Sequence, residues 1–137
     1  MKSQAAQSTS EIIASLPQDV QLVAVSKYHP AEMIREVYEG SPQRIFAESH
    51  AQELQTKHEV LPKDIQWHFI GHLQRNKVKY IVPYISLIHS VDSSRLLTEI
   101  NKQAINAGVR VDCLLQLHVA QEETKFGFTP QECLEYL

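Results

Sequence analysis

Cysteine, glycine and long apolar runs are scarce in this chain, and each scarcity excludes a class of protein. Two cysteines, Cys113 and Cys133, cannot build the disulfide framework of a small secreted domain, so we expect buried thiols in a cytoplasmic protein without a signal peptide. The apolar run 81–88 is broken by Pro83 and is far shorter than the ~20 residues of a membrane span. The four glycines form no GxxxxGK or GxGxxG loop, which disfavours nucleotide sites of those types.

The balance of charge disfavours two further kinds of partner. Lysines and arginines number 13 against 16 aspartates and glutamates, so the net charge of −3 creates no basic field for nucleic acid or an anionic membrane. The basic residues Arg75, Lys77 and Lys79 are expected on a helix, where we interpret them as a solvated face. With 43% hydrophobic residues, the 137 residues suffice for one globular core.

Apolar runs and helical stripes alternate along the chain. Strands are expected at 21–26, 44–48, 66–71, 86–91 and 111–119, and each is followed by a helical pattern. No hairpin turn separates them, so the strands are predicted to form a parallel sheet of α/β type with right-handed crossovers. Two architectures fit: a doubly wound sheet closed with five strands, or part of a (β/α)₈ barrel, which needs eight units and ~250 residues.

Capping residues mark the ends of the expected helices. Residues 1–10 are expected to be loose, with Ser10 capping a short helix that Pro17 stops, and we assign 1–19 to an N-terminal segment and 20–137 to the domain. The later helices are expected at 30–40 with a left-handed stop at Gly40, at 51–61 before Pro62, at 72–82, and from Asp92 or Ser93 to a stop at Gly108.

The last helix begins clearly but has no terminator. Thr129, Pro130 and Glu132 form a cap, a first-turn proline and a capping-box partner. An apolar stripe follows, and the sequence stops at Leu137 with no glycine and no polar tail. We therefore expect a piece of a longer protein rather than a finished five-stranded domain.

Ligands of parallel α/β folds bind beyond the carboxyl ends of the strands. In this chain those positions are 26–27, 48–50, 71–72, 90–92 and 121–125. Lys27 is notable because partial desolvation at the inner end of a valine-rich strand disfavours the ammonium form, which makes the amine a nucleophile suited to Schiff-base chemistry. A strand-end lysine that turns outward to solvent is the alternative.

The seven histidines do not form a metal-binding pattern. His68 and His72 are four residues apart, but Gly71 lies between them at a strand-to-loop junction. They do not share a helix face as paired zinc ligands would, so we predict no metal site.

Five stretches, taken together and in order, are far more specific than Lys27 alone. They are AVSKYHP (24–30), FAESHAQEL (46–54), WHFIGHLQRNK (67–77), HSVDS (89–93) and LLQLHVAQEETKFGF (114–128). They are similar to the motifs A-V-S-K-x-x-P, F-G-E-N-x-x-Q-E, W-H-F-I-G-x-L-Q-x-N-K, H-S-V-D-S and L-x-Q-V-N-x-x-x-E-x-x-K-x-G of the pyridoxal phosphate homeostasis family (the YggS/PROSC group). The chain resembles that family from roughly residue 20 to residue 130.

The resemblance implies a fold and a cofactor. The fold is a single (β/α)₈ TIM barrel of the alanine racemase type, of which about five units are present here. The cofactor is pyridoxal 5'-phosphate (PLP), held on Lys27 as an internal aldimine, that is, a Schiff base. The further cofactor-binding residues implied are Ser49, His68, Ile70 and His118, with no catalytic residue.

The chain departs from the family pattern in three places. Ala47 and Ser49 replace the glycine and asparagine of the second motif, so a shorter hydroxyl must make any contact that the asparagine makes. His118 replaces an asparagine, and its imidazole either stacks on the pyridine ring or fills the core. The family's phosphate-holding serine-glycine segment and its late glycine- and arginine-containing motif are missing, so we predict weak, poorly oriented cofactor binding.

Three functions fit these features. We favour a protein of intracellular vitamin B6 homeostasis that holds PLP and passes it on to apo-enzymes, with Lys125 either a second amine or a solvated lysine. A racemase-like enzyme would need a second acid/base, for which Tyr28 is nearest in sequence. A cofactor-free interaction module is the third. Because a five-eighths barrel leaves two sheet edges unpaired, we expect the chain to self-associate, to pair with its missing remainder, or to rearrange into a flavodoxin-like open sheet.

Overall fold

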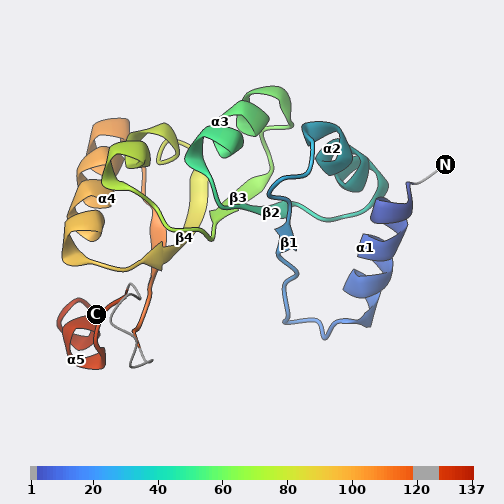
Figure 1. Ribbon diagram of the computed structural model, residues 1–137. Coiled ribbons are helices and arrows are strands. Elements are labelled where there is room, and N and C mark those ends of the chain that lie inside the picture. Colours follow the sequence, from blue (N-terminus) through green and yellow to red (C-terminus); the bar gives the residue numbers. More distant parts are fainter. Residues whose placement is uncertain (1–2, 119–126) are drawn as a thin grey trace.

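The computed structural model describes residues 3–118 and 127–137, and this part of the chain forms one five-stranded parallel sheet (Figure 1). The strands are β1 (Ala24–Val25), β2 (Ile45–Glu48), β3 (Gln66–Phe69), β4 (Ile85–Val91) and β5 (Asp112–Leu115). Each strand pairs in parallel with the next one along the chain. A doubly wound sheet reverses its strand order at a switch point. The sequential order is therefore that of a barrel, and the expected flavodoxin-like rearrangement is wrong.

The connections between the strands lie on one side of the sheet. The helical elements are α1 (Gln4–Ser15), α2 (Ala31–Gly40), α3 (Ala51–Val60), the 3₁₀ helix η1 (Arg75–Tyr80), α4 (Ser94–Ala107) and α5 (Pro130–Glu135). Helices α2, α3 and α4 follow one another along the same face of the curved sheet (Figure 1). We call the opposite face, which corresponds to the interior of a closed barrel, the inner face.

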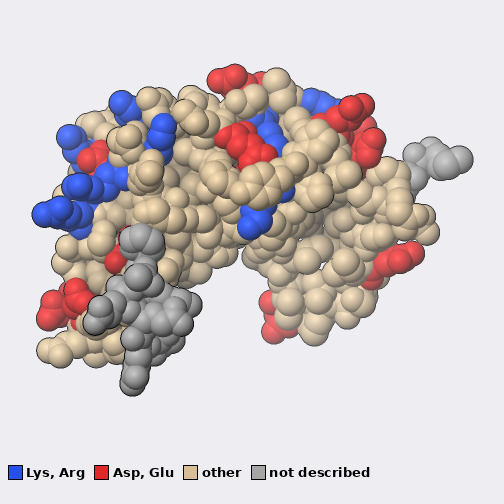
Figure 2. All heavy atoms as spheres, in the orientation of Figure 1, with Lys and Arg blue, Asp and Glu red and all other residues tan. Residues whose placement is uncertain are grey.

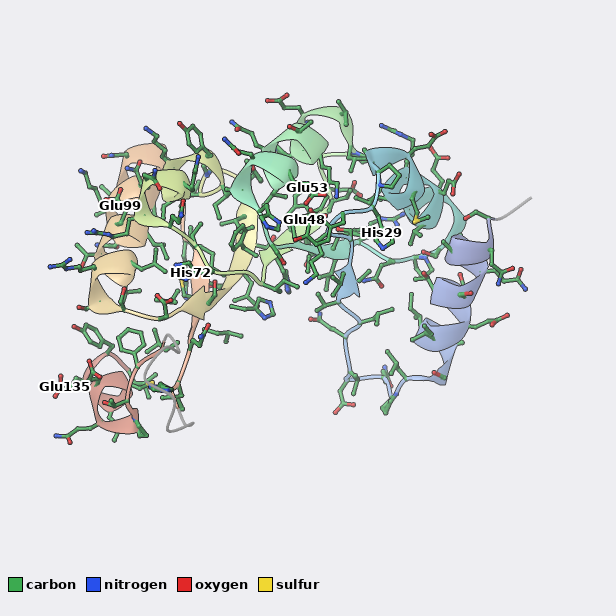
Figure 3. The ribbon with its side chains drawn as sticks, viewed as in Figure 1. His29, Glu48, Glu53, His72, Glu99 and Glu135 are labelled. Atoms are coloured by element: carbon green, nitrogen blue, oxygen red, sulfur yellow. The ribbon has the colours of Figure 1, made fainter. Side chains whose placement is uncertain are left out.

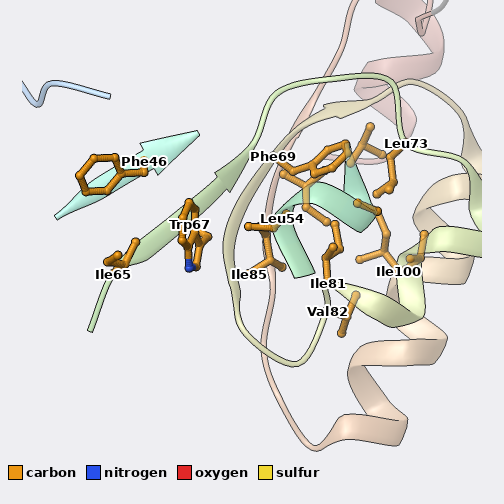
Figure 4. Packing of buried hydrophobic residues seen from close by; sticks show 14 of the residues in the cluster. Phe46, Leu54, Ile65, Trp67, Phe69, Leu73, Ile81, Val82, Ile85 and Ile100 are labelled. Carbon is orange, nitrogen blue, oxygen red and sulfur yellow. The ribbon is translucent and has the colours of Figure 1, made fainter. Parts of the chain in front are cut away.

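The hydrophobic core fills the space between the sheet and these helices (Figure 4). Phe46 and Trp67 lie side by side in register on β2 and β3 and are fully buried. Leu54 of α3 and Ile81 after η1 belong to the same cluster. Burying one such aliphatic side chain contributes roughly 1.5–3 kcal/mol, so this layer is what holds the strands and their carboxyl ends in place.

The inner face is exposed at its two edges. Val25, Ala47 and His68 occupy one row across β1, β2 and β3. Ala47 and His68 are buried in the concave middle, whereas Val25 is 53% exposed and Leu114 on β5 is 49% exposed. Both outer strands therefore present apolar side chains that the described part of the chain leaves uncovered.

The first strand is shorter than predicted. The expected strand covered 21–26, but only Ala24 and Val25 pair with β2. Ahead of them the side-chain amide of Gln43 donates hydrogen bonds to the backbone carbonyls of Leu22 and Ile45, 2.7 Å each. The side-chain amide of Gln43 thus provides the hydrogen bond to the Leu22 carbonyl that a neighbouring strand was expected to provide.

The helix expected at 72–82 is wrong. The chain is extended through Gln74 and then forms only the 3₁₀ helix η1. Leu73, Val78 and Ile81 are buried, while Lys77 is half-buried and Tyr80 is exposed. Tertiary contacts outweigh helix propensity here, because the extended segment brings Leu73 into the core.

The N-terminal segment is more ordered than predicted. Helix α1 begins at Gln4, and Ser3 rather than Ser10 caps it by accepting a hydrogen bond from the N–H of Ala6. The expectation of a loose start overlooked the alanines, which favour helix, and Ala6 is completely buried where α1 packs on α2.

The stop expected at Gly40 is also wrong. Gly40 is the last residue of α2, without a left-handed conformation, and the next residue, Ser41, is extended. The Ser41 hydroxyl donates to the carbonyl of Val37 at 2.6 Å and so satisfies the end of the helix in place of a glycine cap.

The remaining helix ends are confirmed. Ser93 caps α4 through the N–H of Leu96, and Gly108 ends it in the left-handed conformation with a φ of 67°. Thr129 and Glu132 form the expected capping box of α5. Position 119 of the fifth expected strand lies outside the described residues. None of the helices described is long and apolar enough to cross a membrane.

Candidate functional site

Lys27 follows β1 in a tight turn at the carboxyl end of the sheet. The N–H of Ser26 donates to the carbonyl of Ala47 at 2.9 Å, which continues the ladder beyond β1, and the N–H of His29 closes the turn on the carbonyl of Ser26. The Ser26 side chain is buried on the helix side. The alternation of side chains along β1, continued through Ser26, predicts that Lys27 lies on the side of the inner face, and the residue is half-buried.

A cluster of buried charges lies behind this turn, between β2 and α3; Figure 3 shows two of its members, Glu48 and Glu53, close together. The side chain of Glu48 is completely buried and that of Lys57 is only 6% exposed. The Nζ of Lys57 donates to Glu48 Oε2 and to Glu53 Oε2, both at 2.9 Å. The Ser26 hydroxyl donates to Glu48, and the backbone N–H of Tyr28 donates to Glu53 at 2.8 Å. Both carboxylates are therefore paired with the single ammonium group of Lys57.

The two carboxylates of this cluster titrate differently. Desolvation raises the pKa of Glu48, against the hydrogen bonds from Ser26 and Lys57. Desolvation also acts on the more exposed Glu53, but there the hydrogen bonds from Lys57 and the N–H of Tyr28 outweigh it and lower the pKa. Glu53 is thus the firmly ionised partner of Lys57.

Ser49 and Ile70 continue β2 and β3 at the same end of the sheet. Both are half-buried, and the N–H of Ile70 donates to the carbonyl of Glu48 at 2.9 Å. Gly71 approaches Ser49 so closely that a Cβ at Gly71 would lie 2.5 Å from the Ser49 carbonyl oxygen. The absence of a side chain at Gly71 is what permits this approach.

His68 is paired with a second histidine that sequence reasoning missed. Its Nδ1 lies 3.0 Å from Nε2 of His89 on β4, so one ring donates and the other accepts. Burial lowers the pKa of His68, with a further contribution from His89, and burial lowers the pKa of His89. The signal was present in the HSVDS motif, but the irregular register between β3 and β4 that brings the rings together is not readable from sequence.

His118 stands apart from the other expected site residues. It follows β5, at the opposite edge of the sheet from β1, and its N–H donates to the carbonyl of Phe128 at 2.7 Å. Its imidazole Nε2 is buried without a hydrogen-bond partner in the part of the chain that the structure describes. The structure therefore groups Lys27, Ser49, His68 and Ile70 on three adjacent strands and leaves His118 on the far strand.

A hollow of about 250 Å³ opens beside Ser49, on the rim between the start of α3 and the loop before η1. Phe69, His72 and Lys77 are among its lining residues. The Nδ1 of His72 lies 3.1 Å from a carboxylate oxygen of Asp92. The rim of the site is therefore polar.

Other residues named from the sequence are exposed or lie outside the described residues. Tyr28 is 73% exposed and its ring packs against His50, with 5.3 Å between centroids. Arg75 and Lys79 are exposed, and Figure 2 shows lysine and arginine gathered over η1 and α4. Lys125 lies outside the described residues. Over residues 3–118 and 127–137, no three His, Cys, Asp or Glu side chains are placed to hold a metal ion.

Similar curated proteins share one name. No protein-family model matches the chain. It is 42% identical over 115 residues to the "Pyridoxal phosphate homeostasis protein" of Aquifex aeolicus, covering 83% of this chain and 50% of that protein. The human protein of the same name is 36% identical over 138 residues, covering 90% of this chain and 50% of the relative. The chain thus spans about half the length of the curated relatives it matches.

Solved structures agree in fold. PipY of Synechococcus elongatus without PLP is 39% identical with a TM-score of 0.84 over 93% of this chain and 60% of PipY. PipY with PLP bound is 38% identical, with a TM-score of 0.80 over 94% of this chain and 60% of PipY. Alanine racemase of Streptomyces coelicolor matches in fold alone, at 17% identity and a TM-score of 0.56, over 92% of this chain and 32% of the racemase. The expected partial barrel of five strand-helix units is confirmed, and over most of its length the chain is similar to proteins of the pyridoxal phosphate homeostasis family, of which it spans about half.

Proposed function

We propose that the protein binds pyridoxal 5'-phosphate as a Schiff base on Lys27 and takes part in vitamin B6 homeostasis in the cytoplasm. The observation that carries the proposal is a half-buried lysine at the carboxyl end of β1, in a chain whose solved relative is PipY with PLP bound. Ligands of such barrels bind at this end of the strands.

The chemistry needs only the amine and an aldehyde. Lys27 would hold the aldehyde carbon of PLP through a carbon–nitrogen double bond to its Nζ, and the aldehyde oxygen would leave as water with the two amine protons. Water is the only by-product, and neither oxidant nor reductant is required. The reaction is reversible, as a protein that passes the cofactor on requires.

The neighbouring strands supply the walls. Ser49 offers a hydroxyl, Ile70 an apolar side chain, and His68 an imidazole that burial and its pairing with His89 keep neutral. These groups suit an aromatic ring carrying a hydroxyl and an aldehyde. The buried Nε2 of His118, which has no hydrogen-bond partner among residues 3–118 and 127–137, offers one further polar contact from the opposite edge strand.

The binding is proposed to be weak. None of the described residues grouped with Lys27, which are Ser49, His68 and Ile70, is a lysine or arginine that would hold a phosphate, so the covalent bond contributes much of the affinity. We also propose that the chain associates with a second polypeptide through its edges. The exposure of Val25 on β1 and Leu114 on β5 supports this, and light scattering that finds a monodisperse monomer would contradict self-association.

A carrier is favoured over a racemase. Racemisation needs an acid/base on the face of the substrate opposite the lysine. Tyr28, the nearest residue in sequence, is mostly exposed and packs against His50 at the start of α3. We therefore expect no Lys27-dependent exchange of deuterium at the α-carbon of alanine.

The decisive experiment is trapping with borohydride. The purified protein is incubated with PLP, reduced, digested and mapped by mass spectrometry, with Lys27→Ala as the test variant and Lys102→Ala, on the exposed side of α4, as the matched control. The label should sit on Lys27, disappear in the first variant and persist in the second. Label spread over exposed lysines such as Lys63 and Lys102 would refute the proposal.

A further inference from the structure

The buried charge cluster behind Lys27 has no part in forming the Schiff base, yet it is placed against the turn that carries this lysine. We call it the clamp; its members are Ser26, Glu48, Glu53 and Lys57. A completely buried carboxylate beside a buried ammonium is uncommon, because removing both charges from water is costly unless every hydrogen bond is made. The partners of the hydrogen bonds that the clamp residues make therefore indicate the role of the clamp.

Lys57 is the centre of the clamp. Its Nζ donates to both carboxylate oxygens of Glu48 at 3.1 and 2.9 Å, to Glu53 Oε2 at 2.9 Å, and to the backbone carbonyl of Ser26 at 3.0 Å. Three N–H groups thus serve four acceptors, which saturates the ammonium. One of these acceptors is the peptide group that joins Ser26 to Lys27.

The other side of Lys27 is held as well. The backbone N–H of Tyr28 donates to the same Glu53 oxygen that Lys57 contacts, at 2.8 Å. Tyr28 has a φ of 68°, a left-handed conformation that a tyrosine adopts only where its surroundings hold it there. The residues directly before and after Lys27 are therefore both tied to α3, Ser26 through the ammonium group of Lys57 and Tyr28 through the carboxylate of Glu53.

A purely stabilising role would not require this arrangement. An ion pair whose only purpose was to join β2 to α3 would be complete with Glu48 and Lys57, without contacts to the turn. Instead, the carbonyl of Ser26 accepts a hydrogen bond from Lys57, the hydroxyl of Ser26 donates to Glu48, and the N–H of Tyr28 donates to Glu53. These bonds fix the backbone from which the Lys27 side chain projects.

We propose that Lys57, together with Glu48 and Glu53, is a positioning residue that sets the direction of the Lys27 side chain and thereby its rate of reaction with an aldehyde. The inference rests on the proposed function of Lys27. The clamp itself forms no bond with the cofactor. Misplacing a reacting group by about 1 Å can cost on the order of a hundredfold in rate, so a small rotation of the turn is sufficient.

Two variants test the clamp without depending on one that fails to fold. Glu53→Ala releases the N–H of Tyr28 and leaves the fully buried pair of Lys57 and Glu48 in place. The double variant Lys57→Met with Glu48→Leu replaces the buried pair by apolar side chains of similar size, an exchange that proteins often tolerate. Glu59→Ala, an exposed acidic residue on the same helix, is the matched control.

The measurements are the rate of Schiff-base formation with free PLP, followed by its visible absorbance, and the fraction of borohydride label on Lys27. We expect Glu53→Ala and the double variant to react about tenfold more slowly at Lys27, with more label on other lysines, while Glu59→Ala reacts like the parent. Thermal unfolding should show that Glu53→Ala, although less stable than the control, is fully folded at the temperature of the assay. Rescue of the rate by Glu53→Asp, which restores the carboxylate, would support positioning.

The outcomes separate the two proposals. If folded Glu53→Ala labels Lys27 at the parental rate, the clamp does not position the lysine, although the proposed function stands. If the double variant does not fold, Glu53→Ala and its rescue decide alone. If the parent protein itself carries no label on Lys27, the proposed function fails and the inference fails with it.

Discussion

Replacing Gly71 by alanine is expected to disturb the site through a single methyl group. The added Cβ would lie 2.5 Å from the carbonyl oxygen and 2.8 Å from the Cβ of Ser49. Ordinary contacts begin at 3.4 Å, so the segments after β2 and β3 must separate by about 0.9 Å. Ser49 is a wall residue of the proposed site, and the adjoining N–H of Ile70 holds the ladder to β2.

The change in the free energy of unfolding on Gly71→Ala is the balance of two effects. Overpacking against backbone costs typically ~1–3 kcal/mol, since no flexible side chain can move aside. Alanine also reduces the conformational entropy of the unfolded chain, which returns ~0.4–1 kcal/mol at a position without a positive φ. The free energy of unfolding of Gly71→Ala should therefore fall by about 1–2 kcal/mol.

Gly108→Ala is the matched control for this prediction. A Cβ there meets no atom within 4 Å, but the φ of +67° disfavours alanine, so we expect a similar loss of ~1–2 kcal/mol. Urea unfolding measures both losses, and borohydride labelling of Lys27 separates them. Only Gly71→Ala should reduce the labelling. A Gly71→Ala protein with parental stability and parental labelling would refute the reasoning.

Two further predictions concern buried ionisable groups. Lys57→Met alone leaves the carboxylate of Glu48 in the core without its ammonium partner and should lower the free energy of unfolding by ~3–5 kcal/mol. Adding Glu48→Leu should restore most of this loss. If urea unfolding gives equal losses for the single and the double variant, the ion pair is contradicted. The pKa values of His68 and His89 are lowered from 6.5 in the folded state, so the unfolded chain binds more protons than the folded chain as the pH drops below 6.5. The free energy of unfolding should therefore decrease as the pH is lowered, by up to ~1.4 kcal/mol per pH unit for each additional proton. A double substitution to glutamine should flatten this slope between pH 7 and 5, and an unchanged slope would contradict it.

The features of the fold that depend on a few neighbouring residues were readable from the sequence. Ser93 and Gly108 enclose α4, and Thr129 with Glu132 opens α5, because caps are local hydrogen-bonding patterns. The segment before η1 failed because its conformation depends on where Leu73 is buried. The strand order was equally beyond local patterns: the last helix without a terminator favoured part of a barrel, and the family resemblance decided between it and a doubly wound sheet.

The residues of the candidate site also divide into those that the sequence predicted and those that it did not. Lys27 was identified by its place after a buried strand, and Ser49 and Ile70 by the motifs that follow the next two strands. Lys57 was missed because Glu53 and Lys57, four residues apart on a helix, look like an ordinary exposed pair. The available signal was Glu48, a carboxylate inside the wholly buried strand β2, which requires a buried partner.

At its carboxyl end, the two faces of the sheet carry different parts of the proposed site. The helix side carries the clamp, whose members all lie between Ser26 and Lys57, within the first two strand-helix units. The inner side carries Lys27 and the walls, which extend over the further strands to His118. If the clamp orients the amine as proposed, that orientation is a local property of the first two strand-helix units, and it can be tested separately from affinity for the whole cofactor.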